Sequence, residues 1–159
     1  MRHVYLDIET TGNNWQHGDR IVEIGAVEVW HGALTERRFH VYLNPDKRSH
    51  PEAFERHGLS RSFLREHNRF DWIDHLLFEF IRGARLYMRD ARFAVEFLNA
   101  EICRLGDKSH DYVAAGKYLK ISDLVESVYD VADMLQLATL GEDWSLDLLC
   151  ARFLVDPPE

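Results

Sequence analysis

The chain has 159 residues, a formal net charge of −8 at pH 7 and 46% hydrophobic residues. A chain of this length is expected to form one domain that buries about two thirds of its unfolded surface without disulfides. The negative charge opposes tight non-specific binding to nucleic acid, which depends on clustered lysine and arginine. It does not exclude a nuclease, because cations held by acidic side chains can bind the phosphates at a strand's end.

Two features bear on the compartment. The N-terminus enters an apolar stretch almost at once, and no apolar run approaches the roughly 18 residues of a membrane span. Cys103 and Cys150 both fall in apolar helical patterns without paired spacing, so we interpret them as buried thiols of a reducing compartment. We therefore expect a soluble cytoplasmic protein that does not bind membranes.

The first predicted strand covers residues 4–12 and carries two acids before a closing glycine. Asp7 and Glu9 are two positions apart, so their side chains share one face of the strand, where their oxygens can bind a hard cation such as Mg²⁺. The alternative is a pair of solvated strand-end acids without a ligand. Residues 21–30 and 39–45 predict the next two strands, which complete an antiparallel meander.

The middle of the chain is predicted to be helical. Pro51 begins a short helix that ends near Gly58, and Ser60 caps the next one. Residues 71–82 have apolar side chains at helical spacing, which we interpret as a core-facing stripe that ends at Gly83. The predicted stripe consists of Trp72, Ile73, Leu76, Leu77, Phe80 and Ile81.

In the second half, residues 84–88 predict a fourth strand, and a helix follows from Phe93. Residues 117–121 predict a fifth strand. Helices are expected over residues 122–135 and 145–154, because each begins with a serine and has an acid in its first turn. In the loop after the first strand, Trp15 either packs on the domain or stacks on a base.

Taken in order, these segments resemble the epsilon-type 3′-5′ exonucleases, the proofreading subunits of bacterial DNA polymerase III. The resemblance covers nearly the whole chain and rests on the ordered motifs Asp7-Ile8-Glu9-Thr10-Thr11-Gly12, residues 21–29, 40–45, 51–54, 57–59, 97–101 and 145–153. It implies an α/β, ribonuclease H-like fold with a mixed five-stranded sheet and flanking helices, in a single domain over residues 1–159.

The resemblance also implies site residues. Members of the family use four acids and a histidine, and Asp7 and Glu9 occupy the positions of the first two acids, which are catalytic and bind Mg²⁺ or Mn²⁺. The pocket for the terminal nucleotide is expected to be bordered by Thr10, Thr11, Gly12 and His57.

The chain departs from the family pattern at the third acid. Members read His-Asn-Ala-x-Phe-Asp where this chain reads Arg89-Asp90-Ala91-Arg92-Phe93-Ala94, so Ala94 stands in the place of a metal-binding aspartate. Asp90 and Glu96 are the nearby candidates to replace it. Glu96 is about 200° around the helix from that position, and Asp90 reaches the site only if its loop bends inward. Arg89 itself either faces solvent or neutralises the two acids of the first strand.

The second departure lies at the end of the sequence. Family members continue into a helix with His-x-x-x-x-Asp, which supplies the general base and the fourth acid, and this chain ends at Glu159 without that motif. Tyr129 and Asp133 match the Tyr-x-x-x-Asp spacing of a related subclass. They lie upstream of the motif at residues 145–153, so we interpret them as a solvated helix face.

These departures favour a catalytically impaired or inactive homologue, leaning towards a protein that is not an enzyme and binds cations weakly or not at all. Its expected role is to bind a single-stranded nucleic-acid 3′ end, a polymerase or an accessory protein. Without the final helix, an apolar side of the sheet would be uncovered, which predicts self-association or a helix supplied by a partner. The alternative is an active metal-dependent 3′-5′ exonuclease that releases nucleoside monophosphates from DNA.

Overall fold

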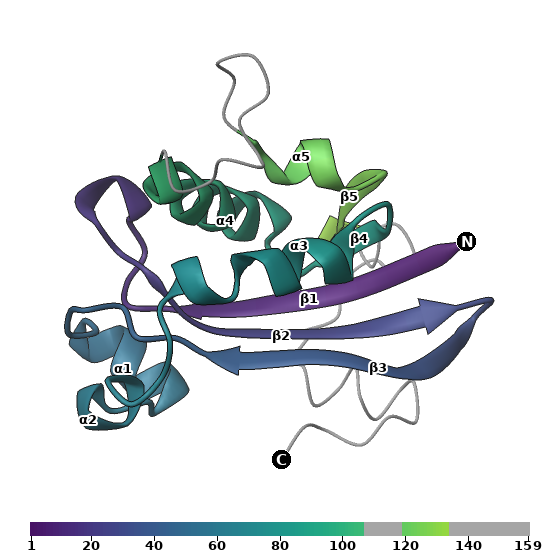
Figure 1. Cartoon of the computed structure of the whole chain (residues 1–159). Coiled ribbons are helices and arrows are strands. Elements are labelled where there is room, and N and C mark those ends of the chain that lie inside the picture. The colour runs from purple at the N-terminus through teal and green to yellow at the C-terminus, as the bar shows by residue number, and fades with distance from the viewer. Residues whose placement is uncertain (107–118, 134–159) are drawn as a thin grey trace.

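The computed structural model describes residues 1–106 and 119–133, and within them a five-stranded sheet has the strand order β3-β2-β1-β4-β5 (Figure 1). The strands are β1 (Arg2–Thr10), β2 (Ile21–Trp30), β3 (Ala33–Tyr42), β4 (Arg85–Met88) and β5 (Ser127–Asp130). β1, β2 and β3 pair antiparallel, whereas β4 is parallel to β1 and β5 is parallel to β4. The mixed five-stranded sheet predicted from the sequence is therefore present.

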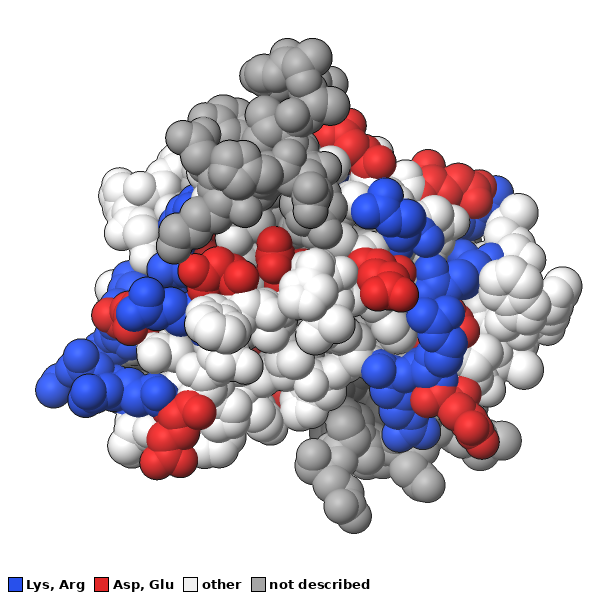
Figure 2. All heavy atoms as spheres, in the orientation of Figure 1, with Lys and Arg blue, Asp and Glu red and all other residues white. Residues whose placement is uncertain are grey.

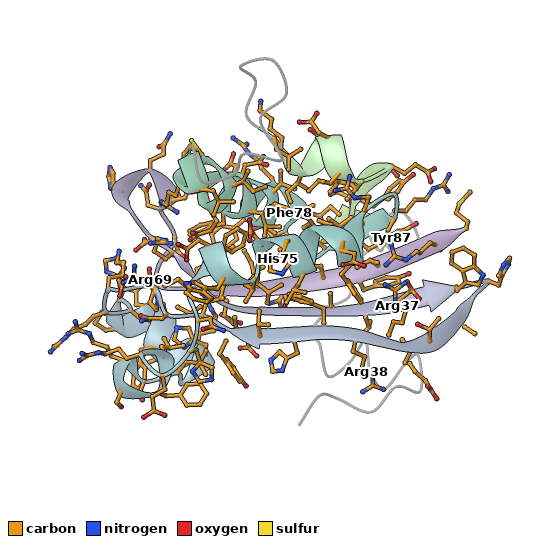
Figure 3. All side chains as sticks on the ribbon, viewed as in Figure 1. Arg37, Arg38, Arg69, His75, Phe78 and Tyr87 are labelled. Carbon is orange, nitrogen blue, oxygen red and sulfur yellow. The ribbon has the colours of Figure 1, made fainter. Side chains whose placement is uncertain are left out.

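Helices cover one face of the sheet and one of its ends. They are η1 (Trp15–His17), α1 (Pro51–His57), α2 (Arg61–Leu64), η2 (Phe70–Trp72), α3 (Asp74–Ile81), α4 (Ala91–Leu105) and α5 (Ile121–Leu124). α3, marked by His75 and Phe78 in Figure 3, and α4 lie over the sheet, while α1 and α2 lie where β1 ends (Figure 1).

The alternation of β1 places the core on one face and acids on the other. Val4, Leu6 and Ile8 are buried, and they pack in one cluster with side chains from α3 and α4. Asp7 and Glu9 therefore face away from that core near the carboxyl end of β1. Because β4 and β5 run parallel to β1, the carboxyl ends of all three strands lie at the same edge of the sheet.

The helix predicted over residues 71–82 is interrupted, which changes which side chains are buried. A short 3₁₀ turn ends at Trp72, Ile73 leaves helical geometry with φ −120°, and α3 begins at Asp74. The shifted helical phase exposes Trp72 and Leu76, at 69% and 48%, and buries Phe78. The predicted stripe was therefore right for Ile73, Leu77, Phe80 and Ile81 and wrong for the other two.

The prediction of the fifth strand was wrong in position. Residues 121–124 form α5, residues 117–118 lie outside the described ranges, and the fifth strand is β5. The helix predicted over residues 122–135 is also wrong, because part of that range forms a strand. Val128 and Tyr129 pair with β4, and the ring of Tyr129 stacks on that of Tyr87 with centroids 5.0 Å apart. The helix predicted over residues 145–154 lies outside the described residues.

Other differences are smaller. β3 begins at Ala33, ahead of the predicted residue 39, and its first half is mostly exposed, so it lacks the apolar pattern of a strand. α4 begins at Ala91 rather than Phe93. Cys103 is exposed on α4 rather than buried, and Cys150 lies outside the described residues. Within the described part of the chain, no helix has the length and apolar character needed to cross a membrane.

Candidate functional site

The acidic pair on β1 has the shared orientation that its spacing predicts. Asp7 is exposed and Glu9 is partly exposed, on the face of the strand opposite to the core. The residue paired with Asp7 on β2 is Gly25, and no atom lies within 4 Å of the position that a Cβ would occupy there. The space beside Asp7 is therefore open to a ligand.

Few protein groups bind these two carboxylates. Asp7 Oδ1 accepts a hydrogen bond from the backbone N–H of Ile8 at 3.0 Å. Glu9 Oε2 accepts one from Nε of Arg56 at 3.2 Å, and the Arg56 side chain is 48% exposed. No other hydrogen bond or ion pair to either side chain is found within residues 1–106 and 119–133, so most of their oxygen lone pairs remain available.

The cation beside the acidic pair comes from α1 and not from the loop before α4. Of the two alternatives that the sequence left open for Arg89, the structure shows the solvent-facing one, because Arg89 is exposed and forms no ion pair within the described residues. Arg56 takes this position because α1 lies where β1 ends (Figure 1).

The turn after β1 is closed by its own hydrogen bonds. The side chains of Thr10 and Thr11 are fully buried; Thr10 Oγ1 donates to the carbonyl of Gly12 at 2.7 Å, and Thr11 Oγ1 donates to Asp19 at 3.0 Å. A Cβ at Gly12 would lie 2.3 Å from Asp19 Oδ2 and 2.3 Å from Cδ2 of His50. Glycine is therefore needed at position 12 for close packing, and the role of this turn in nucleotide binding stays a prediction.

His57, at the end of α1, has a ring nitrogen without a partner. Its Nδ1 accepts a hydrogen bond from the N–H of Leu59 at 2.9 Å, so the neutral ring carries its proton on Nε2. Nε2 is buried and makes no hydrogen bond of normal geometry in the described residues, although the backbone of Thr10 lies close enough to act on the pKa of the ring. Burial lowers the pKa of His57, which favours the neutral ring at pH 7. Nε2–H is therefore a fixed donor of the kind that the predicted nucleotide pocket needs.

Among the described residues, no third acid completes a metal site with Asp7 and Glu9; Glu23 lies opposite Glu9 on β2 but pairs with His40 at 2.7 Å. Ala94 is 2% exposed and packs in the core. Asp90 caps α4 by accepting a hydrogen bond from the N–H of Phe93, and Glu96 accepts hydrogen bonds from Trp15 Nε1 and Arg92 Nε. Among the described residues, no group of three or more His, Cys, Asp and Glu side chains is placed to hold a metal ion.

Two further sequence interpretations can be compared with the structure. Trp15 packs against the core and donates to Glu96, so of the two alternatives it adopts the packing role. Tyr129 lies on β5 rather than on a solvated helix face. Asp130, which sequence reasoning missed, accepts hydrogen bonds from the N–H groups of Ala91 and Ala132 at 2.7 and 2.8 Å. It ties the start of α4 to the end of β5, and a correct position for that strand would have identified it.

The donor set fits one hard divalent cation. Asp7 and Glu9 present carboxylate oxygens to the same open space, and such oxygens suit Mg²⁺ and Mn²⁺ better than softer metals. The described residues thus supply two acidic ligands for a cation at the carboxyl end of β1.

Comparison with known proteins identifies relatives of this chain. The model of the Exonuclease family (RNase_T) matches residues 4–158. The chain is 36% identical over 156 residues to the DNA polymerase III subunit epsilon of Rickettsia felis, covering 98% of this chain and 64% of that protein. It is 37% identical over 159 residues to the DNA polymerase III subunit epsilon of Escherichia coli K12, covering 98% and 61%. The chain therefore spans less than two thirds of the length of these relatives.

Solved structures show the same fold. A product-bound structure of exonuclease I superposes with a TM-score of 0.69 at 15% identity, covering 98% of this chain and 39% of that chain. Exonuclease X in complex with 5′ overhanging duplex DNA gives a TM-score of 0.63 at 15% identity, covering 98% and 77%. The predicted ribonuclease H-like fold is confirmed.

These matches correct one expectation from the sequence. The replacement at Ala94 and the missing terminal motif led us to expect that the chain is not an enzyme. The family match and the epsilon subunits among its relatives contradict that expectation, because they place the chain in the Exonuclease family. The expectation was wrong because it took the loss of activity from two departures alone, Ala94 and the absent terminal motif.

Proposed function

Since the chain belongs to the Exonuclease family, we propose that it acts as a metal-dependent 3′-5′ exonuclease that releases nucleoside monophosphates from DNA. The observation that carries the proposal is the acidic pair, Asp7 and Glu9, which shares an open face at the carboxyl end of β1. The likeness to subunits of DNA polymerase III supports DNA as the substrate and a polymerase subunit as the partner. Such a subunit would act in the cytoplasm.

In this proposal each described residue of the site has a separate task. Asp7 and Glu9 would hold Mg²⁺ or Mn²⁺, which supplies charge stabilisation at the phosphoryl oxygens and an acidified water. Nε2–H of His57 donates a hydrogen bond to the bound nucleotide, and the neutral ring avoids placing a second positive charge there. Arg56 changes partner from Glu9 to a phosphate when the substrate binds, because guanidinium matches both anions.

The resemblance implies two more acids and a histidine base. The described residues supply none of them next to Asp7 and Glu9. The proposal therefore rests on the family match and on Asp7 and Glu9, and the assay below tests whether the chain cleaves DNA through these two acids.

The test is degradation of single-stranded DNA labelled at its 3′ end, with Mg²⁺ or Mn²⁺, by the chain and by Asp7→Ala. The expected result is metal-dependent release of mononucleotides that falls about 10³-fold in the variant, since a cation ligand supplies several kcal/mol of transition-state stabilisation. Glu52→Ala removes an exposed acid of α1 and should leave the rate unchanged. Release that is absent, or equal with and without Asp7, would overturn the proposal.

A further inference from the structure

A pocket outside the acidic pair combines features that suit a nucleotide. The loop before α1 and the junction of α1 with α2 enclose about 230 Å³, lined by Arg48, Ser49, Phe54, Leu59 and Arg61. Figure 2 shows that Lys and Arg side chains gather on this side of the molecule, over α1 and α2. Residues 47–69 contain six Lys or Arg and three Glu, in a chain whose net charge is −8.

The two arginines of this pocket have no acidic partner in the described residues, and its aromatic ring is partly exposed. Neither guanidinium, of Arg48 or of Arg61, forms an ion pair with an acid in the described residues, in contrast to Arg56 and Arg69, which pair with Glu9 and Asp46. The ring of Phe54 is 44% exposed. Ser49 Oγ is buried and has no hydrogen-bond partner in the described part of the chain.

Each of these groups favours one part of a nucleotide. Guanidinium groups bind phosphate through paired hydrogen bonds. An exposed aromatic ring stacks on any base, which suits an enzyme that must accept every sequence. An unpartnered buried hydroxyl gains a hydrogen bond when a polar ligand enters.

The pocket is continuous with the acidic pair through α1. Phe54 contacts His57 edge to face, with ring centroids 6.4 Å apart, and Arg56 between them pairs with Glu9. One helix therefore presents the stacking ring, the unpartnered imidazole and the arginine at the cation site within a single turn.

We propose that this pocket binds a nucleotide on the 5′ side of the terminal one in a single strand of DNA. Its phosphate contacts Arg48 and Arg61, and its base stacks on Phe54. This inference rests on the proposed function, because it sets the path of the strand that leads to Asp7 and Glu9.

The experiment measures binding without cleavage, by fluorescence anisotropy of a short labelled oligothymidylate in EDTA at several salt concentrations. The double variant Arg48→Gln with Arg61→Gln should weaken binding about tenfold and lower the slope of log K against log salt by about 0.7, the value for one phosphate contact on a single strand. Phe54→Ala should weaken binding about 5- to 150-fold, as expected for a lost stacking partner.

Two matched controls separate the pocket from general effects. Arg65→Gln removes an exposed arginine of the same segment that does not line the pocket, and Phe63→Ala removes a ring of similar exposure, 39%, on α2. Both should bind the oligonucleotide like the unaltered chain. Equal weakening by the controls, or no binding by the unaltered chain, would overturn the inference.

The proposed function is judged separately by nucleotide release with Mg²⁺ or Mn²⁺. If the unaltered chain releases nucleotides but the Arg48, Arg61 and Phe54 variants bind the oligonucleotide normally, the pocket proposal is rejected and the exonuclease proposal stands. Pocket-dependent binding without release rejects the exonuclease and supports the pocket. Thermal melting of every variant verifies that the fold is intact.

Discussion

Acidic residues have opposite surroundings in two regions of this molecule. Glu101 on α4 is 1% exposed and accepts hydrogen bonds from Arg20 at 2.8 and 2.8 Å, from the N–H of Ile21 at 3.2 Å and from Arg104 at 3.3 Å. At the carboxyl end of β1, the partners found within residues 1–106 and 119–133 are Arg56 at 3.2 Å for Glu9 and the backbone N–H of the next residue for Asp7.

The difference separates acids that hold the fold from acids that are available to a ligand. A buried carboxylate is tolerated only when donors satisfy its oxygens, and Glu101 meets that condition. The β1 pair is at least partly exposed and incompletely paired, so two negative charges lie near each other and one guanidinium, that of Arg56, pairs with Glu9. Net charge does not distinguish the two cases, because each acid contributes one negative charge to the total of −8 wherever it lies.

The largest effect should follow from changing an available acid. Glu9→Gln removes a charged ligand and should lower the rate of DNA degradation about 10³-fold, because the cation loses one of its two described carboxylates. The free energy of unfolding should change by less than about 1 kcal/mol, since the ion pair with Arg56 is exposed. Rates come from the 3′-label assay and stability from urea denaturation.

A neighbouring acid provides the control for this prediction. Glu55→Gln changes the same residue type next to Arg56, at an exposed position to which the site assigns no task, and should retain the full rate. If Glu9→Gln also retains the full rate, Glu9 is not a ligand. The distinction between acids that hold the fold and acids that are available to a ligand would then be wrong.

The next effect concerns the acid that holds the fold. Arg20→Met leaves Glu101 buried with Arg104 as its remaining cation, and should cost about 3–5 kcal/mol in the free energy of unfolding. The matched control is Arg92→Met, which breaks an exposed pair with Glu96 and should cost less than about 0.5 kcal/mol. Urea denaturation compares the two, and equal costs would show that burial does not set the strength of these pairs.

The sequence predicted the parts of the fold where local pattern and environment agree. β2 spans the predicted residues, and the alternation of β1 correctly placed Asp7 and Glu9 on one face. β5 was misplaced because its stability comes from pairing with β4, some forty residues earlier in the chain. The break at Ile73 was missed because a helical spacing of apolar residues continues across it.

In the candidate site, the sequence could not predict contacts between segments that lie far apart in the chain. Arg56 lies 47 residues from Glu9 in the chain, and no local pattern links them. The resemblance placed His57 beside the nucleotide, but its unpartnered Nε2 depends on how α1 packs.

A smaller effect is expected when pH changes the free energy of unfolding through the carboxyl of Glu28. Burial alone raises the pKa of Glu28, but hydrogen bonds from Arg2 and Thr35 outweigh it and hold the pKa below the ordinary value of 4.5. As pH falls, the unfolded chain therefore takes up this proton first, so the stabilisation is present above about pH 4.5 and is lost below it.

Variants test this pH dependence directly. Glu28→Gln should flatten the decline of the unfolding free energy below pH 4.5, by less than the loss in Arg20→Met. Glu52→Gln, at an exposed acid, should leave the curve unchanged. Parallel curves for the chain and Glu28→Gln would show that this carboxyl titrates alike in both states.

The smallest effect should come from Arg56, the one cation at the available pair. Its guanidinium repels a divalent cation bound at Asp7 and Glu9, so Arg56→Gln should tighten Mn²⁺ binding about fivefold at low salt, the scale of one unit charge acting through water. Isothermal titration calorimetry measures the affinity, with Arg65→Gln as a control for loss of an exposed arginine elsewhere on the same side. The gain should shrink as salt rises, because the charges are half exposed and screened. An unchanged affinity in Arg56→Gln would mean that the guanidinium does not act on a cation bound at Asp7 and Glu9, and would contradict the electrostatic role given to Arg56.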